Sequence, residues 1–205
     1  DSYTTDDRDG LFDAIITSES LNISGKVKID GFYVGIYTKG TCSINSGAEV
    51  TMTKTVYGVY SNAQLAFTSN GKFNFQNTAS STKGGSSIAF LTYRATNTFH
   101  FTGNSETTIK TGYEGFGTPS YSDTATSNKI TIRVSGNANF NVTTDNSSLY
   151  SYGLSNINNF IVENENGTYD IHKDRKYSYE LYGGSTTKLD YYPYEKADFN
   201  ENKIV

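Results

Sequence analysis

The sequence has very little of what stabilises many small secreted domains. It contains one cysteine, one methionine, two prolines and no tryptophan in 205 residues. The lone cysteine, Cys42, cannot form an internal disulfide, so the chain does not rely on disulfide stapling. Two prolines leave almost every backbone N–H able to donate in a β-ladder. No apolar run approaches the roughly 18 residues of a membrane-spanning helix.

Charge is also sparse. Charged residues make up 19% of the chain, and 17 Lys and Arg against 21 Asp and Glu give a net charge of -4. This balance argues against nucleic acid and against membrane insertion, and we expect a monomer. The two histidines, His100 and His172, are too few and too far apart for a histidine metal site, so we predict no metal and no cofactor.

Aromatic and β-branched residues are plentiful instead. The chain has 17 Tyr, 12 Phe and 19 Gly, and Val, Ile and Thr recur from end to end. This composition is typical of β-strands. It is too aromatic and too weakly charged for a disordered chain, so the sequence predicts an all-β domain.

An internal repeat organises these residues. Each copy has two short alternating apolar segments around a polar corner that usually contains glycine, as in Leu21-Asn-Ile23, Gly25 and Val27-Lys-Ile29. Further copies begin at Cys42, Leu65, Phe99, Ile132 and Phe160. A third, tyrosine-rich segment follows each pair, at 34–37, 56–60, 88–93, 113–116, 150–154 and 179–182.

This repeat predicts a parallel β-solenoid. Alternation indicates half-buried strands, and a three-segment unit repeated along the chain indicates one three-sided coil per copy. Stacked coils would align Leu21, Cys42, Leu65, Phe99, Ile132 and Phe160 in one inward column, and Ile23, Ile44, Phe67, Phe101, Val134 and Val162 in a second. A meander sandwich with turns at Gly and Asn is the alternative, because it also shows alternation.

The ends differ in composition from the middle. We expect residues 1–20 to form an N-terminal cap, residues 21–187 to form about six to seven coils, and residues 188–205 to form a C-terminal cap over the exposed strand edges. The whole of 1–205 would then be one domain.

The run Leu21-Asn-Ile-Ser-Gly-Lys-Val-Lys-Ile29, followed by Gly31-Phe-Tyr-Val-Gly-Ile-Tyr37, carries a family resemblance. It resembles the pectate-lyase-like adhesive domains of Gram-positive fibrillar surface adhesins and is similar to the lactobacillus epithelium adhesins. The resemblance covers about residues 21–171 and implies a right-handed β-helix. It further implies an extracellular fragment of a larger wall-anchored protein on the bacterial cell surface, which binds a host epithelial or matrix glycan or glycoprotein without catalysis.

Two other functions stay open. The domain could be a structural stalk module without a ligand, or a polysaccharide lyase or hydrolase. An enzyme of the second kind needs clustered or paired carboxylates, whereas Glu49, Glu106, Glu114, Asp123 and Asp145 are scattered over different copies. We therefore predict no catalytic residue, and we expect Cys42 to be a buried structural thiol.

The candidate ligand site is an insertion. The loop Gly112–Asn128 breaks the coil period, and sugars are bound by aromatic faces together with planar polar groups. The predicted ligand-binding residues are Tyr113, Phe116, Tyr121 and Asp123 in this loop, Arg94 and Arg133 beside it, and Tyr150 and Tyr152 in the next coil. The alternative is a variable loop that packs its own aromatic side chains over the solenoid wall.

Overall fold

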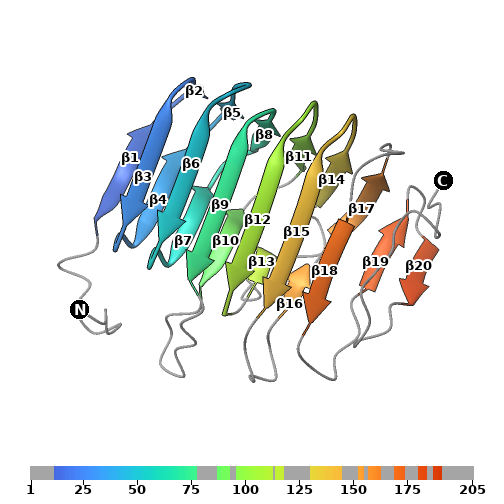
Figure 1. Cartoon of the computed structure of the whole chain (residues 1–205). Helices are drawn as coiled ribbons and strands as arrows, with labels where there is room; N and C mark the ends of the chain where they lie inside the picture. The colour runs from blue at the N-terminus through green and yellow to red at the C-terminus, as the bar shows by residue number, and fades with distance from the viewer. Residues whose placement is uncertain are drawn as a thin grey trace.

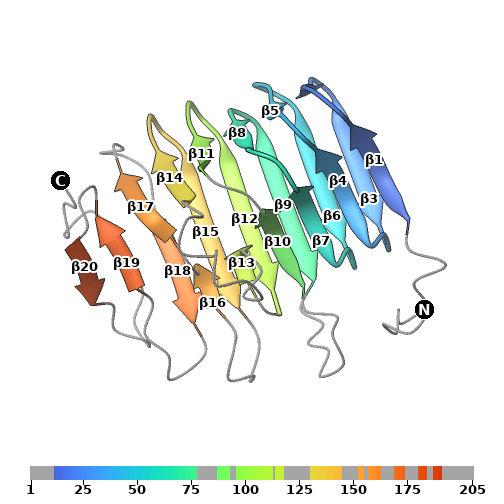
Figure 2. The same ribbon diagram turned by 180° about the vertical axis from the view of Figure 1, so that it is seen from behind.

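The architecture is a stack of coils with three parallel sheets (Figures 1 and 2). A computed structural model of the chain describes residues 12–77, 87–92, 96–112, 114–117, 130–144, 152–154, 157–162, 169–173, 180–183 and 187–190. All of its elements in these ranges are β-strands. No helix in the described part is long and apolar enough to cross a membrane.

Each sheet has six strands, and every pairing within the three sheets is parallel. Sheet A contains β1 (Asp13–Thr17), β4 (Val34–Thr38), β7 (Tyr57–Ser61), β10 (Ile88–Thr92), β13 (Glu114–Gly117) and β16 (Tyr152–Leu154). Sheet B contains β2 (Leu21–Ile23), β5 (Thr41–Ile44), β8 (Ala66–Ser69), β11 (Asn97–Phe101), β14 (Ile130–Val134) and β17 (Ile157–Val162). Sheet C contains β3 (Lys26–Asp30), β6 (Glu49–Thr53), β9 (Lys72–Asn77), β12 (Glu106–Thr111), β15 (Asn139–Thr144) and β18 (Tyr169–Lys173).

The coil is right-handed. In Figure 1 the strands of sheet A run upward at the back, those of sheet C run downward at the front, and the chain advances from left to right. This is the hand that crossover connections between parallel strands almost always take. The predicted right-handed parallel solenoid is therefore confirmed, and the meander sandwich is wrong because no neighbouring strands within these sheets are antiparallel.

Most of the two predicted caps lies outside the described residues, which begin at 12 and end at 190. The first strand of sheet A, β1, pairs in parallel with β4, so the first coil begins at Asp13, inside the stretch expected to be a cap. At the other end, β19 (Glu180–Gly183) does not join sheet A as a further tyrosine-rich segment. It pairs antiparallel with β20 (Thr187–Asp190) in a two-stranded sheet, so this hairpin spans the boundary expected at residue 188.

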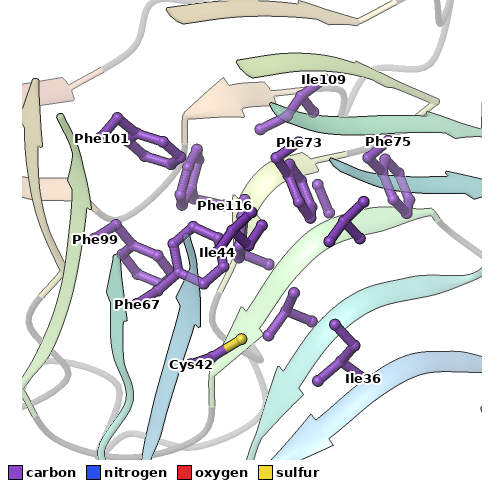
Figure 3. Close-up of a cluster of buried hydrophobic side chains, with 14 of the residues drawn as sticks. Ile36, Cys42, Ile44, Phe67, Phe73, Phe75, Phe99, Phe101, Ile109 and Phe116 are labelled. Carbon is purple, nitrogen blue, oxygen red and sulfur yellow. The ribbon is translucent and has the colours of Figure 1, made fainter. Parts of the chain in front are cut away.

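The core consists of columns of inward side chains (Figure 3). It is aliphatic in the first two coils, with Ile36, Ile44 and Met52 fully buried, and becomes rich in phenylalanine in the next two. Phe90 and Phe116 stack with ring centroids 4.8 Å apart and an interplanar angle of 13°. Rings of adjacent coils contact each other, as Phe67 does with Phe90 and Phe99 with Phe116, so the columns bind successive coils together.

The register of sheet B matches the predicted columns in all but the third coil. Cys42 lies in register with Phe67, and Ile44 lies in register with Ser69, so both predicted members of this coil are misplaced by two residues. Leu65 instead precedes β8 and is buried, with its N–H donating to the Asn97 Oδ1 at 2.9 Å. Alternation alone could not detect the error, because a shift of two residues keeps the same face of the strand.

A glycine lies at the corner between sheets B and C in several coils. Gly47, Gly103 and Gly136 have φ values of 79°, 63° and 70°. Residues other than glycine rarely adopt this left-handed backbone conformation. In these three coils the bend between two parallel strands therefore favours glycine, whereas Gly25 and Gly71 at the corresponding corners have no left-handed φ.

Candidate functional site

The solenoid presents three outward faces, and the register determines which side chains share each face. Outward residues of neighbouring coils form rows about 4.8 Å apart. The faces of sheets A, B and C differ in chemistry: sheet A carries tyrosines, sheet B carries short hydroxyl side chains, and sheet C carries charges and amides.

The outer face of sheet A has a cluster of half-buried tyrosines, here called the tyrosine patch: Tyr33, Tyr37, Tyr57 and Tyr60. The ring centroids of Tyr33 and Tyr57 are 5.0 Å apart, and those of Tyr37 and Tyr60 are 5.3 Å apart. A third contact of 6.4 Å between Tyr57 and Tyr60 joins the two pairs into one cluster.

Two neighbours extend the tyrosine patch along the first coils. Lys39 has its Nζ 6.0 Å from the centroid of the Tyr37 ring, within the range of a cation–π contact. Ile16, which is in register with Tyr37, is 68% exposed. The face therefore combines aromatic rings, phenolic hydroxyls, one ammonium group and an exposed aliphatic side chain.

The outer face of sheet C carries a ladder of alternating charge. Lys26, Glu49, Lys72 and Glu106 occupy equivalent positions in four successive coils. Lys26 Nζ lies 3.5 Å from Glu49 Oε2, and Lys72 Nζ lies 2.7 Å from Glu106 Oε2. The hydrogen bond and charge of Glu106 raise the pKa of Lys72, which keeps this lysine protonated.

A surface hollow of about 290 Å³ opens on this same face. Its walls come from β6, β9 and β12, and it is lined by Glu49, Lys72, Phe73, Asn74, Gln76, Glu106, Thr108 and Lys110. Phe73 is almost fully buried in the core, so the other residues give the hollow its polar character.

The outer face of sheet B carries mostly small side chains, together with the imidazole of His100 and the guanidinium of Arg133. Thr41, Ala66, Thr98 and Thr131 form one row across it. His100 is half-buried on this face, as alternation predicts, and its Nε2 lies 2.7 Å from the Ser135 Oγ. The Ser135 hydroxyl in turn donates to the Thr102 Oγ1 at 2.9 Å, so these groups bond to each other along the corner.

The residues predicted for the ligand site do not come together on one described face. Phe116 is the clear correction, because it lies in β13 with 0% exposure and packs against Phe90 and Phe99. The expected exposed loop thus begins with a core strand of sheet A. Alternation within Glu114-Gly-Phe116-Gly directs the ring inward, as it does for Phe90 in register with it.

Arg133 is exposed, but it lies on sheet B in register with His100 and Ile161. Tyr152 begins β16 in sheet A, in register with Glu114. The remaining predicted site residues lie outside the described residues: Arg94, Tyr113, Tyr121, Asp123 and Tyr150.

The tyrosine patch is the feature that sequence reasoning missed as a site. Its signal was present, since the tyrosine-rich third segments include Tyr37, Tyr57 and Tyr60. Alternation places successive side chains on opposite faces of a strand, but it does not tell which set faces the core. Only the register of sheet A shows that these rings leave the core and gather on one surface.

Three further titratable groups in the described part have shifted pKa values. Burial raises the pKa of the Cys42 thiol to about 12, so this side chain remains a neutral thiol at ordinary pH. A hydrogen bond from the Thr53 hydroxyl, 2.6 Å long, lowers the pKa of Asp30. Partial burial raises the pKa of Asp13, at the start of β1.

No group of three or more His, Cys, Asp or Glu residues in the described ranges is arranged to hold a metal ion. Comparisons with protein-family models, with curated proteins and with solved structures gave no match.

Proposed function

We propose that this chain is a non-enzymatic, extracellular adhesin domain of a Gram-positive bacterium that binds a host glycan or glycoprotein. The observation that carries the proposal is the tyrosine patch on sheet A, where ring contacts of 5.0 to 6.4 Å place aromatic groups on one half-exposed face. Sugar rings present C–H faces that pack on aromatic rings, and phenolic hydroxyls can hydrogen-bond to sugar hydroxyls.

The scaffold suits this task. Parallel pairing along the whole sheet fixes the backbone of β4 and β7, so the tyrosines need little further ordering when a ligand binds. Half-burial of each tyrosine ring also restricts its rotamers before a ligand binds. A preorganised aromatic surface favours binding because less conformational entropy is lost on association.

The carboxylates on sheet C also favour binding over hydrolysis. Glu49 and Glu106 occupy the same row with Lys72 between them, and each is within ion-pair distance of a lysine. A glycosidase needs two carboxyl groups that flank the scissile bond and are free to act on the sugar. Here both carboxylates are engaged by lysine side chains of adjacent coils.

An experiment on the isolated chain tests the proposal. The 205-residue chain, immobilised, would be probed with an array of mammalian and plant glycans, and the Tyr60→Ala variant would be compared with the wild type. We expect a subset of glycans to bind and Tyr60→Ala to weaken that binding by about 10- to 100-fold, as loss of an anchoring aromatic does.

Two controls make the result specific. Thr68→Ala, on the outer face of sheet B, removes a small side chain far from the tyrosine patch and should leave the affinity unchanged. Tyr60→Phe retains the ring and should keep most of the affinity. If no glycan or glycoprotein binds the wild-type chain, the adhesin function is wrong, and if Tyr60→Ala binds like the wild type, the patch is not the site.

A further inference from the structure

The hollow on sheet C has a simple origin in the sequence. On β9 the outward side chains are Lys72, Asn74 and Gln76, and on β12 they are Glu106, Thr108 and Lys110. In both strands a short side chain lies between two long ones. The neighbouring coils break this pattern, since Thr53 of β6 and Asn139 of β15 are short at the flanking positions.

The groups around the hollow are polar and of mixed charge. The Glu106 carboxylate accepts from Lys72 at 2.7 Å, but Lys110, in register with Gln76, has no ion pair among the residues that the structure describes. The side-chain amides of Asn74 and Gln76 and the Thr108 hydroxyl also line the space. The hollow therefore offers an ammonium group, two amides, a hydroxyl and carboxylate oxygens.

We infer that this hollow is a second binding site, distinct from the tyrosine patch, for a sugar unit that bears a carboxylate. The Lys110 ammonium would pair with the ligand carboxylate, a charge-assisted contact stronger than a neutral hydrogen bond. The amides of Asn74 and Gln76 donate and accept at once, which matches vicinal sugar hydroxyls. Glu106, held in place by Lys72, accepts from a further hydroxyl.

The size of the hollow is consistent with one such unit. A volume of about 290 Å³ lies just below the roughly 300–1,000 Å³ typical of small-molecule sites, which suits a single sugar unit. The site also lies on a different sheet from the tyrosine patch. The inference therefore does not depend on the function proposed for sheet A.

The test uses a tetrasaccharide that contains glucuronate and its carboxyl-reduced counterpart, in which glucose replaces each glucuronate. Each is titrated into the full ¹⁵N-labelled chain while the side-chain amide signals of Asn74 and Gln76 are followed by NMR. We expect the acidic tetrasaccharide to shift both signals and to bind about tenfold more tightly than the neutral one, because only the acidic sugar can pair with Lys110.

Matched variants locate the contact. Lys110→Met should reduce the affinity for the acidic tetrasaccharide about tenfold and remove its advantage over the neutral one. Lys28→Met removes the same charge from the same sheet, two coils before the strand β9 that lines the hollow, and should change the affinity by less than about twofold. Tyr60→Ala should leave the titration unchanged.

Three results would overturn the inference. These are unchanged amide signals of Asn74 and Gln76, equal affinity for the acidic and neutral tetrasaccharides, and equal losses in Lys28→Met and Lys110→Met. A loss in Tyr60→Ala together with unshifted Asn74 and Gln76 signals would assign the acidic sugar to sheet A. Unfolding midpoints equal to that of the wild type would confirm that each variant folds.

Discussion

At the scale of single residues, the core contains a polar atom that its column does not accommodate. Thr107 lies on β12 in register with Phe73 and Phe140, and it is 2% exposed. Its Oγ1 is buried and has no hydrogen-bond partner among the residues that the structure describes. A hydroxyl removed from water without a partner destabilises the folded state.

We therefore predict that Thr107→Val stabilises the chain by about 1 kcal/mol, because valine has nearly the same shape and removes the unsatisfied group. Urea denaturation of the variant and the wild type would measure the difference in the free energy of unfolding. Thr108→Val, on the outward face of the same strand, is the control and should change stability by less than about 0.5 kcal/mol. A destabilised Thr107→Val would show that the hydroxyl has a partner in solution.

At the scale of elements, sheet A requires glycine where its strands approach the core most closely. A Cβ on Gly58 of β7 would lie 2.5 Å from the Ala89 carbonyl oxygen and 2.8 Å from the Phe75 Cδ2. Gly35 of β4 is similarly close to the Gly58 carbonyl oxygen and the Met52 Sδ, both at 2.7 Å. These contacts involve backbone and buried rings, which cannot move aside easily.

Gly58→Ala should therefore destabilise the chain by about 2 kcal/mol, the usual magnitude for overpacking a core. Gly25→Ala is a matched control, because nothing lies within 4 Å of its added Cβ and its φ is not left-handed. That variant should be neutral or slightly stabilising, since alanine restricts the unfolded chain. Thermal unfolding of both variants would decide, and equal melting temperatures would contradict the close approach of β7 to the core.

At the scale of the whole molecule, stability should depend on position along the stack. A solenoid coil contacts only its neighbours, so an inward residue in a middle coil packs on two sides and one in the first coil packs on one. Ile15 and Ile36 illustrate the difference, because they are in register in sheet A but only Ile36 is fully buried.

We predict that Ile36→Ala costs about 2–5 kcal/mol and that Ile15→Ala costs less than half as much, because the cavity left at Ile15 opens toward solvent. Guanidinium denaturation of the two variants would compare their free energies of unfolding. Equal losses would mean that the first coil is packed as tightly as the second, against the partial exposure of Ile15.

The class of fold could be predicted from the sequence alone. Alternation in each short segment, glycine at the corners and a tyrosine-rich third segment in each copy favour three strands per coil over a meander sandwich, and the pairing confirms this for β2 to β18. These signals are local or periodic, so they survive without knowledge of long-range contacts. The burial of Cys42 followed in the same way from its place in the repeat.

The register and the composition of each outer face could not be predicted from the sequence. The placement of Phe67 and Ser69 beside Cys42 and Ile44 depends on pairing between coils, which alternation leaves free by steps of two residues. The burial of Phe116, the gathering of tyrosines on sheet A and the hollow around Lys110 have the same origin. Each depends on which side chains of different coils become neighbours, and strand pairing fixes these neighbours.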